Sequence, residues 1–357
     1  MEIKKTLLPD SKLKPLFADP LALKFGQHFT DYMFTLWYKE GKGWHSPEIK
    51  PYGPLPLEPS AAVFHYGQEI FEGQKAYKSK QNQILMFRPD ENAKRFNMSM
   101  TRMSMPTIPE ADFLHYEEEL LKLEQRWIPQ VKGAALYLRP TGIATEAALG
   151  VRPATEYLFF IILCPVGPYY STGFNPVSLW VSEEYSRAGE GGTGAAKAGG
   201  NYGGSLIASK KASAMGCNQV LWLDAREHRY VEEVGAMNIL FVMGNKLVTP
   251  PLKGTILPGI TRKSLLHLSA DLGLEPEERP LAIDEVIEGI QSGKVTEIFG
   301  AGTAAVVSPV GKIRFRDKEY VINNNQTGPW TQKFFDTLTG IQYGELEDKY
   351  GWVHVVK

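Results

Sequence analysis

The sequence predicts a protein of mixed α and β structure, α+β or α/β, with two domains. The chain has 357 residues, which is more than a typical single domain contains. Segments with strand-like alternation and segments with helical periodicity occur in both halves of the chain. Three prolines and two glycines between Pro165 and Pro176 are typical of a linker. We therefore expect a smaller N-terminal domain at 1–164, a linker at 165–176 and a larger C-terminal domain at 177–357.

In the N-terminal domain, the pattern of apolar residues predicts several strands, one hairpin and helices between them. The strands are expected at 31–38, 134–139 and 157–163, and the hairpin joins 76–77 to 84–88. Pro140 and Gly142 are expected to end the strand at 134–139. Residues 62–73 are expected to form a strand that runs into a short helix. One helix is expected to begin at Pro89, and the other to cover 110–128.

In the C-terminal domain, the same patterns predict more strands and helices. The expected strands are 177–181, 220–223, 230–234 and 295–299, with a hairpin of 238–243 and 246–249. The expected helices are 205–215, which Gly216 should end, 262–272, 282–292 and 328–342.

The composition is that of an ordinary globular protein. Hydrophobic residues make up 43% of the chain, charged residues 22%, and the formal net charge is -1. This charge does not favour nucleic acid or an anionic membrane as a partner. The longest apolar run, 157–165, is too short to span a bilayer. Because no leader segment is evident and both cysteines, Cys164 and Cys217, have apolar neighbours, we expect a reducing, cytoplasmic location.

The segment 189–204 is dense in glycine and holds a single lysine, Lys197. One interpretation is a flexible linker, although linkers are more often rich in serine. A second is a phosphate-binding P-loop, which requires Gly-Lys-Ser/Thr, whereas Lys197 lies between two alanines. The third is a lysine amine held in a tight loop, with no acidic residue next to it in sequence, which suits covalent chemistry with a carbonyl.

Other residues could complete a site for a phosphorylated aldehyde cofactor. Tyr202 could reach a ring hydroxyl, and Glu232 or Glu233 could pair with a ring nitrogen. The turns at 259–261 and 302–303 offer backbone N–H groups to a phosphate. Each feature also has a plainer interpretation as a strand end, a turn or, for Arg95, a solvated helix face. The residues alone therefore indicate a glycine-lined lysine site and no specific reaction.

The chain resembles the branched-chain amino acid aminotransferases, which belong to the fold-type IV class of pyridoxal phosphate enzymes and are related in fold to D-amino acid aminotransferase. The resemblance extends from Phe25-Gly26 to beyond Pro309. The motifs that carry it are His65-Tyr66, Phe71-Glu-Gly73, Phe87-Arg88-Pro89, Tyr137-Leu-Arg139-Pro-Thr, Lys197-Ala-Gly-Gly-Asn-Tyr202-Gly, Gln219-Val-Leu-Trp222, Glu233-Val-Gly-Ala-Met-Asn238, Ile256-Leu-Pro-Gly-Ile260 and Phe299-Gly-Ala-Gly-Thr303-Ala304. It implies a two-domain fold with pyridoxal 5'-phosphate in the cleft between the domains.

The resemblance also implies a role for each cofactor-binding residue. Lys197 would form the Schiff base and shuttle the proton at the substrate Cα. Glu233, rather than Glu232, would hold the pyridine nitrogen protonated, and Tyr202 would bind the ring hydroxyl. The residues implied at the phosphate are Arg95, Ile260, Thr261 and Thr303. No metal is implied.

For the substrate, the resemblance implies an apolar pocket with one cation at its rim. The implied lining is Phe25, Tyr66, Phe71 and Tyr137, with Arg139 accepting the γ-carboxylate of glutamate. Ala304 would offer its backbone N–H to the substrate carboxylate. Leu149 and Val151 match a loop that reaches in from the neighbouring subunit, so a homodimer is expected.

Two departures from the family are visible. Some members carry a Cys-x-x-Cys pair where this chain has Ala305-Val-Val-Ser308, so a thiol switch there is excluded. The family often has threonine at the position of Ala236, which removes one possible contact to the substrate carboxylate.

The resemblance implies transamination of L-leucine, L-isoleucine and L-valine with 2-oxoglutarate, giving branched 2-oxo acids and L-glutamate. The partners are therefore small amino acids and 2-oxo acids. The alternatives are another fold-type IV enzyme (a D-amino acid transaminase or an aminodeoxychorismate lyase), a non-catalytic relative, or a nucleotide-binding protein. The missing Gly-Lys-Ser/Thr argues against the last.

Overall fold

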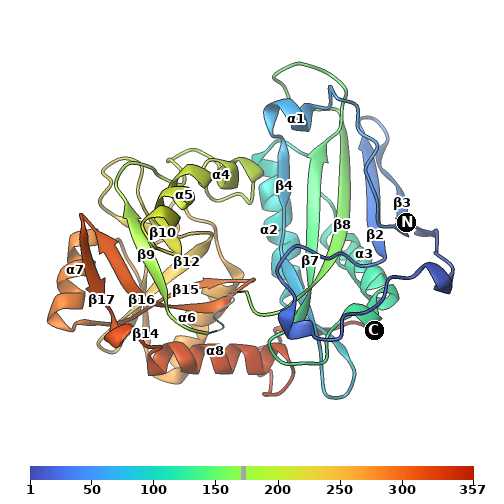
Figure 1. Cartoon of the computed structure of the whole chain (residues 1–357). Coiled ribbons are helices and arrows are strands. Elements are labelled where there is room, and N and C mark those ends of the chain that lie inside the picture. Colours follow the sequence, from blue (N-terminus) through green and yellow to red (C-terminus); the bar gives the residue numbers. More distant parts are fainter. Residues whose placement is uncertain (170–173) are drawn as a thin grey trace. The chain divides into compact units, whose positions relative to one another are not determined.

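A computed structural model describes residues 1–169 and 174–357 (Figure 1). The chain divides into two compact units. The N-terminal unit comprises Met1–Tyr169, Ala196–Gly199 and Gly340–Lys357, and the C-terminal unit comprises 170–195 and Gly200–Thr339. The predicted linker at 165–176 includes 170–173, which lie outside the described residues. The short segment Ala196–Gly199 places Lys197 in the N-terminal unit.

The N-terminal unit is built on one mainly antiparallel sheet of nine strands. The strand order is β1-β3-β2-β8-β7-β5-β6-β18, and β4 also pairs with β7. The strands are β1 (Lys4–Lys5), β2 (Tyr32–Lys39), β3 (Gly43–Pro51), β4 (Glu69–Phe71), β5 (Gln74–Lys78), β6 (Ile84–Phe87), β7 (Ala135–Ala144), β8 (Glu156–Val166) and β18 (Val353–Val355). β7 and β8 pair over their whole common length, from Ala135 with Val166 to Ala144 with Tyr157.

Two helices pack together on this sheet (Figure 1). They are α2 (Pro89–Arg102) and α3 (Glu110–Leu123), and a shorter helix, α1 (Ala62–Tyr66), precedes β4. Pro89 begins α2 and acidic residues follow it, which suits the positive end of the helix dipole. In the core, the rings of Phe34 and Tyr116 stack at 4.5 Å and those of Phe96 and Phe159 meet at 5.2 Å. Burying each such ring stabilises the fold by about 1.5–3 kcal/mol.

The C-terminal unit contains a second sheet of nine strands, six of which close into a ring. The order is β11-β10-β9-β16-β15-β12-β13-β14, β17 pairs with β16, and β11 also pairs with β12. The strands are β9 (Val177–Ser182), β10 (Gln219–Leu223), β11 (Val231–Val234), β12 (Met237–Met243), β13 (Lys246–Thr249), β14 (Glu275–Glu278), β15 (Val295–Gly302), β16 (Val306–Phe315) and β17 (Lys318–Val321). Every residue of β12 is buried, so both of its faces are covered.

The remaining helices and turns complete the two units. The helices are α4 (Gly199–Gly203), α5 (Leu206–Ala214), α6 (Ile260–Leu272), α7 (Ile283–Ser292) and α8 (Pro329–Gln342). Short 3-10 turns lie at Asp10–Lys12, Pro20–Ala22, Gln125–Trp127 and Asn323–Asn325. Gly273 and Gly293 end α6 and α7 in the left-handed conformation that glycine tolerates best. In the described part of the chain, none of the helices is both long and apolar enough to cross a membrane.

Two element predictions are wrong. In 62–73 the helix α1 comes first and the strand β4 follows it, the reverse of the expected order. Pro140 does not end its strand, because β7 continues to Ala144. The reason is tertiary: the neighbours of β7 on that edge, β4 and β5, are interrupted between Phe71 and Gln74. The missing N–H of Pro140 falls at this interruption, where no ladder hydrogen bond is lost.

Most other element predictions are confirmed within one or a few residues, including the hairpin β12–β13 and the helices α2, α5, α6, α7 and α8. The predicted helix at 110–128 ends earlier, at Leu123, and a 3-10 turn follows. Strands β1, β3, β14, β16, β17 and β18 were not predicted. Two of them have sequences that do not favour a strand, because β14 reads Glu-Pro-Glu-Glu and β16 contains Pro309 and Gly311. Cys164 and Cys217 are free and buried, as expected.

Glu124 is a buried carboxyl next to the C-terminal end of α3. Its side chain is 1% exposed and accepts a hydrogen bond from the backbone N–H of Tyr32. Burial raises the pKa of Glu124 from 4.5 to about 7, although the Tyr32 N–H and the Thr30 hydroxyl act in the opposite direction. The folded protein therefore retains a proton here that the unfolded chain releases at lower pH.

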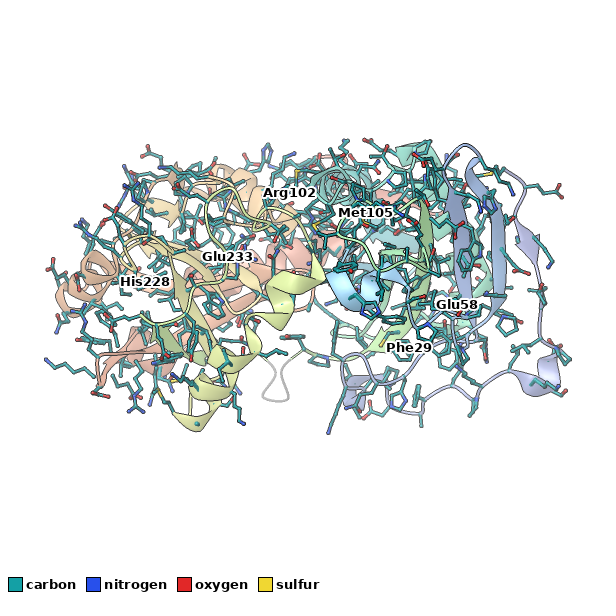
Figure 2. The ribbon with its side chains drawn as sticks, turned by 90° about the horizontal axis from the view of Figure 1, so that it is seen from above. Phe29, Glu58, Arg102, Met105, His228 and Glu233 are labelled. Carbon is teal, nitrogen blue, oxygen red and sulfur yellow. The ribbon has the colours of Figure 1, made fainter. Side chains whose placement is uncertain are left out.

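We expect this carboxyl to weaken the fold as the pH rises. The protonated carboxyl of Glu124 makes its full contribution to the free energy of unfolding below about pH 4.5, and this contribution is lost as the pH rises through about 7. The variant E124Q cannot ionise. Its free energy of unfolding, relative to that of the wild type, should therefore rise by about 3 kcal/mol between pH 4.5 and pH 8. Urea unfolding at both pH values measures this change. E58Q, at an exposed carboxyl (Figure 2), is the control and should show no such gain. A stability difference for E124Q that is constant with pH would contradict the assignment.

Candidate active site

Backbone contacts fix Lys197 against the N-terminal sheet. Its N–H donates to the Ser99 hydroxyl at 3.0 Å, and its carbonyl accepts the N–H of Phe71 at 3.0 Å. The next residue, Ala198, forms an isolated β-bridge with Ile70. The Lys197 amine lies 4.8 Å from the centre of the Phe71 ring. The lysine is therefore held by α2 and by β4, and it does not lie in a flexible loop.

The glycines of this segment are required by close packing. A Cβ at Gly199 would overlap the carboxylate of Glu69, and a Cβ at Gly194 would overlap the backbone of Thr255. A flexible linker would not have such neighbours. The interpretation of 189–204 as a linker is therefore wrong, and the segment is a tightly shaped loop.

Arg95 is buried on α2 and paired with Glu72. Its side chain is 8% exposed, and that of Glu72 is fully buried. Nε and Nη2 of Arg95 donate to Oε1 and Oε2 of Glu72 at 2.7 and 2.9 Å. Burial alone would raise the pKa of Glu72, but Arg95, Lys197 and Asn92 together hold it below its ordinary value. The interpretation of Arg95 as a residue on a solvated helix face is wrong.

Four of the predicted substrate residues lie together in the N-terminal unit. The rings of Phe25 and Tyr137 meet edge to face at 4.8 Å. The Arg139 guanidinium lies 4.5 Å from the centre of the Phe71 ring, and its Nη2 donates to the Tyr137 hydroxyl at 3.1 Å. The buried Nε of Arg139 has no hydrogen-bond partner among the described residues. The group is an aromatic wall with one cation beside it.

The other three predicted substrate residues of this unit are exposed. Tyr66 is 41% exposed, Leu149 69% and Val151 89%. Tyr66 ends α1, and Leu149 and Val151 lie in the connection between β7 and β8. The structure of this single chain does not place them against the aromatic wall.

Glu233 is a buried carboxylate in the C-terminal unit (Figure 2). Its Oε1 accepts the Leu257 N–H at 2.9 Å and the Asn238 side-chain amide at 3.1 Å. Its Oε2 lies 2.7 Å from Nε of Arg187. Arg187 is itself anchored, because its Nη2 donates to the Gly194 carbonyl at 2.9 Å. A guanidinium and two N–H donors favour the ionised form of Glu233.

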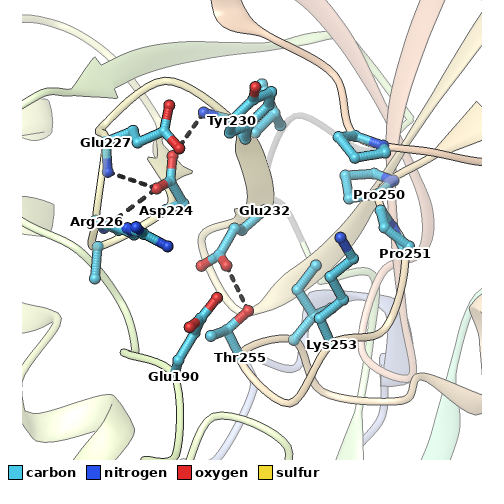
Figure 3. Close-up of a pocket in the computed structure, with 14 residues that line it drawn as sticks. Glu190, Asp224, Arg226, Glu227, Tyr230, Glu232, Pro250, Pro251, Lys253 and Thr255 are labelled. Atoms are coloured by element: carbon cyan, nitrogen blue, oxygen red, sulfur yellow. Dashed lines mark hydrogen bonds between the residues drawn. The ribbon is translucent and has the colours of Figure 1, made fainter.

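Glu232, the neighbour of Glu233 on β11, has different surroundings. It accepts a hydrogen bond from the Thr255 hydroxyl and lines a pocket of about 550 Å³ with Glu190 and Asp224 (Figure 3). Burial raises the pKa of Glu232, and the Thr255 hydroxyl and the Arg187 charge act against that rise. Glu232 and Glu233 are both buried, so the interpretation of a solvated strand end is wrong. None of the predicted site residues lines this pocket.

The remaining predicted residues lie in turns and at helix ends of the C-terminal unit. Ile260 and Thr261 form the first turn of α6, and both are buried. No side chain caps that helix, whose N-cap is Gly259. Its first N–H groups therefore keep the polarity that binds an anion. Tyr202 lies in α4, and the half-buried Thr303 and Ala304 lie in the turn between β15 and β16.

The sequence model of the family described as "Amino-transferase class IV" matches residues 69–313, more than half of the chain. The chain belongs to the class IV aminotransferases. This aminotransferase is 50% identical over 357 residues to a Staphylococcus aureus (strain MRSA252) protein named "Probable branched-chain-amino-acid aminotransferase", covering all of this chain and 98% of the relative. The predicted family and the predicted enzyme class are confirmed.

Solved structures of branched-chain aminotransferases share the fold of this aminotransferase. The Escherichia coli enzyme has a TM-score of 0.77 at 26% identity, covering 92% of this chain and 99% of that one. The T.th. enzyme, solved in complex with N-(5'-phosphopyridoxyl)-L-glutamate, has a TM-score of 0.72 at 25% identity, covering 90% of this chain and 98% of that one. The predicted fold class, that of fold-type IV aminotransferases, is confirmed.

The sequence did not single out four polar residues that organise these groups. They are Glu72, Ser99, Arg187 and Asn238. Glu72 and Asn238 lie within recognised motifs, where a charged or amide side chain among apolar residues is the available signal. Ser99 and Arg187 carry no local signal, because their partners lie far away along the chain.

Gly73 allows the Tyr137 hydroxyl to approach the backbone of this aminotransferase. A Cβ at Gly73 would overlap that hydroxyl, whereas a Cβ at Gly53 would have no heavy atom within 4 Å. G73A should therefore lower the free energy of unfolding by about 1–3 kcal/mol, as other overpacked sites do. G53A is the matched control and should stay near the wild type. Urea unfolding curves measure both, and equal values for the two variants would show that Tyr137 moves aside without cost.

Proposed function

We propose that this aminotransferase transfers the amino group of L-leucine, L-isoleucine or L-valine to 2-oxoglutarate, giving a branched 2-oxo acid and L-glutamate. The relative that it matches over its whole length carries the branched-chain name. The observation that carries the proposal is the aromatic wall of Phe25, Phe71 and Tyr137 beside Arg139. An apolar wall suits a branched side chain, and a guanidinium with an unsatisfied Nε suits the γ-carboxylate of glutamate.

The residues of each unit fit pyridoxal 5'-phosphate as the cofactor of this class IV enzyme. In the N-terminal unit there is a positioned amine at Lys197 and a buried cation at Arg95. In the C-terminal unit there is a buried carboxylate at Glu233 and an uncapped helix N-terminus at α6. The T.th. enzyme binds a phosphopyridoxyl derivative of glutamate. The location of the cofactor in a cleft between the domains stays a prediction.

Each residue would have a separate task. When bound, the cofactor supplies an aldehyde that takes up the amino group and a ring that withdraws electrons from the substrate Cα. Lys197 would hold it covalently and then move the proton at Cα through Nζ. Glu233 would keep the ring nitrogen protonated. Tyr202 would bind the ring hydroxyl, and Ala304 the substrate carboxylate. The residues proposed at the phosphate are Arg95, Ile260, Thr261 and Thr303.

We also propose a homodimer located in the cytoplasm. Leu149 and Val151 are apolar side chains exposed on one connection, where a second copy would cover them. The proposal that they complete the substrate pocket of a second copy follows from the family resemblance. The predicted domain limits, 1–164 and 177–357, likewise stay a prediction.

The first test is the visible spectrum of the purified protein. A yellow protein should bleach with L-leucine and recover with 2-oxoglutarate. K197A should fold, because the backbone hydrogen bonds of residue 197 to Ser99 and Phe71 do not depend on the side chain, yet it should lose all turnover. A yellow protein that responds to D-amino acids or releases pyruvate would support the other fold-type IV activities. A colourless protein that gains no band from added cofactor would overturn the proposal.

The two adjacent glutamates should differ sharply in their effect on turnover. E233Q removes the carboxylate that Arg187, Asn238 and Leu257 hold ionised, so kcat should fall by about 10²-fold or more. E232Q is the matched control and should change kcat little, because that carboxyl lies on the pocket side of the strand. Steady-state kinetics with leucine measure both, and the opposite ranking would assign the ring nitrogen to Glu232.

A further inference from the structure

We propose that Glu72 is a positioning residue: its carboxylate holds the Arg95 guanidinium in place and balances the charges of Arg95 and Lys197. The inference rests on the proposed function, because Arg95 and Lys197 are the residues proposed to bind the cofactor in this unit. Glu72 lies in the short break between β4 and β5, directly after Phe71. From that position its side chain contacts Arg95 and Asn92 of α2 and interacts with the charge of Lys197.

Both oxygens of Glu72 are fully engaged. Oε1 accepts from Nε of Arg95, and Oε2 accepts from Nη2 of Arg95. Oε2 also accepts from the Asn92 amide at 2.8 Å and from the Gly73 N–H at 3.1 Å. Two parallel bonds from one carboxylate fix both the place and the plane of the guanidinium. The remaining N–H groups of Arg95 therefore point in a direction that Glu72 determines.

The carboxylate also acts on the lysine. The positive charge of Lys197 is among the influences that lower the pKa of Glu72. Because the attraction between two charges is mutual, the Glu72 carboxylate also attracts the Lys197 side chain. The groups that face Glu72 are Arg95 and Asn92 of α2, Lys197, and Glu117 of α3.

Glu117 is a second buried carboxyl in this cluster, and its state is different. Among the described residues it has no cation beside it: its Oε1 accepts from the Gln74 amide, and its Oε2 has no hydrogen-bond partner. Burial, followed by the charge of Glu72, raises the pKa of Glu117 well above its ordinary value. The Gln74 carbonyl oxygen is likewise unpaired in the described structure. The surroundings of Glu117 therefore favour its protonated form, whereas those of Glu72 favour its ionised form.

This difference provides a matched pair of variants. E72Q removes a charge and places an amide against the N–H groups of Arg95. E117Q replaces a carboxyl whose protonated form is favoured with a neutral amide of nearly the same shape. The protein with its cofactor bound is titrated from pH 5 to pH 10 while the visible spectrum is recorded. Loss of the Glu72 charge should move the pH midpoint of the spectral change downward by about one unit. E117Q should leave the midpoint unchanged.

A third variant separates charge from position. E72D keeps the charge but is shorter, so its midpoint should stay near that of the wild type. Its affinity for pyridoxal 5'-phosphate, measured by titrating cofactor-free protein, should fall about tenfold or more, because Arg95 loses its two-point anchor. If E72Q does not fold, the E72D affinity alone decides the question. E117Q should bind the cofactor like the wild type.

The outcomes distinguish this inference from the proposed function. If the wild type shows no visible band with added cofactor, the proposed function fails. If the wild type behaves as expected but E72Q and E117Q shift the midpoint equally, the role of Glu72 is overturned. Unchanged cofactor affinity in E72D would equally overturn its positioning of Arg95.

Discussion

The predicted site residues of the N-terminal unit depend on two hydrogen bonds made by the backbone of one residue. The N–H and the carbonyl of Lys197 bind Ser99 of α2 and Phe71 of β4. They attach a four-residue segment to the N-terminal unit, although the chain on either side belongs to the C-terminal unit. Because these bonds fix the backbone of Lys197, they also fix the point from which its side chain extends toward the aromatic and charged groups around it. Gly199 makes this attachment possible, since any side chain there would displace Glu69.

Buried carboxyls in this protein fall into two kinds, and their surroundings decide which. Glu72 and Glu233 each have a guanidinium nitrogen at 2.7 Å and further N–H donors. Glu117 and Glu124 are equally buried but lack such a partner among the described residues, so burial dominates and both retain protons more readily. Glu72 and Glu233, whose partners favour the ionised form, are also the two carboxyls proposed to act on the cofactor or on its ligands. Glu117 lies on α3, and Glu124 directly follows that helix.

The predicted substrate residues combine apolar surface and a positive charge in a small space. Phe25, Phe71 and Tyr137 provide apolar surface, and Arg139 lies against two of these rings. A guanidinium that stacks on aromatic rings needs less water than an ammonium group would. A cation can therefore lie beside an apolar wall without disrupting it. Such an arrangement is compatible with leucine and glutamate as alternative substrates of one enzyme.

The sequence by itself determined most of the local elements and the family, and it predicted the site residues. The helix start at Pro89 and the β12–β13 hairpin depend on neighbouring residues, so short-range rules describe them. Only the tertiary structure decided that β7 continues through Pro140 and that Arg95 is buried on Glu72. The tertiary structure also decided that Arg187 forms a salt bridge with Glu233. Each of these results depends on strand register or on partners distant in the chain, and the free energy of burial that controls them exists only after the chain has folded.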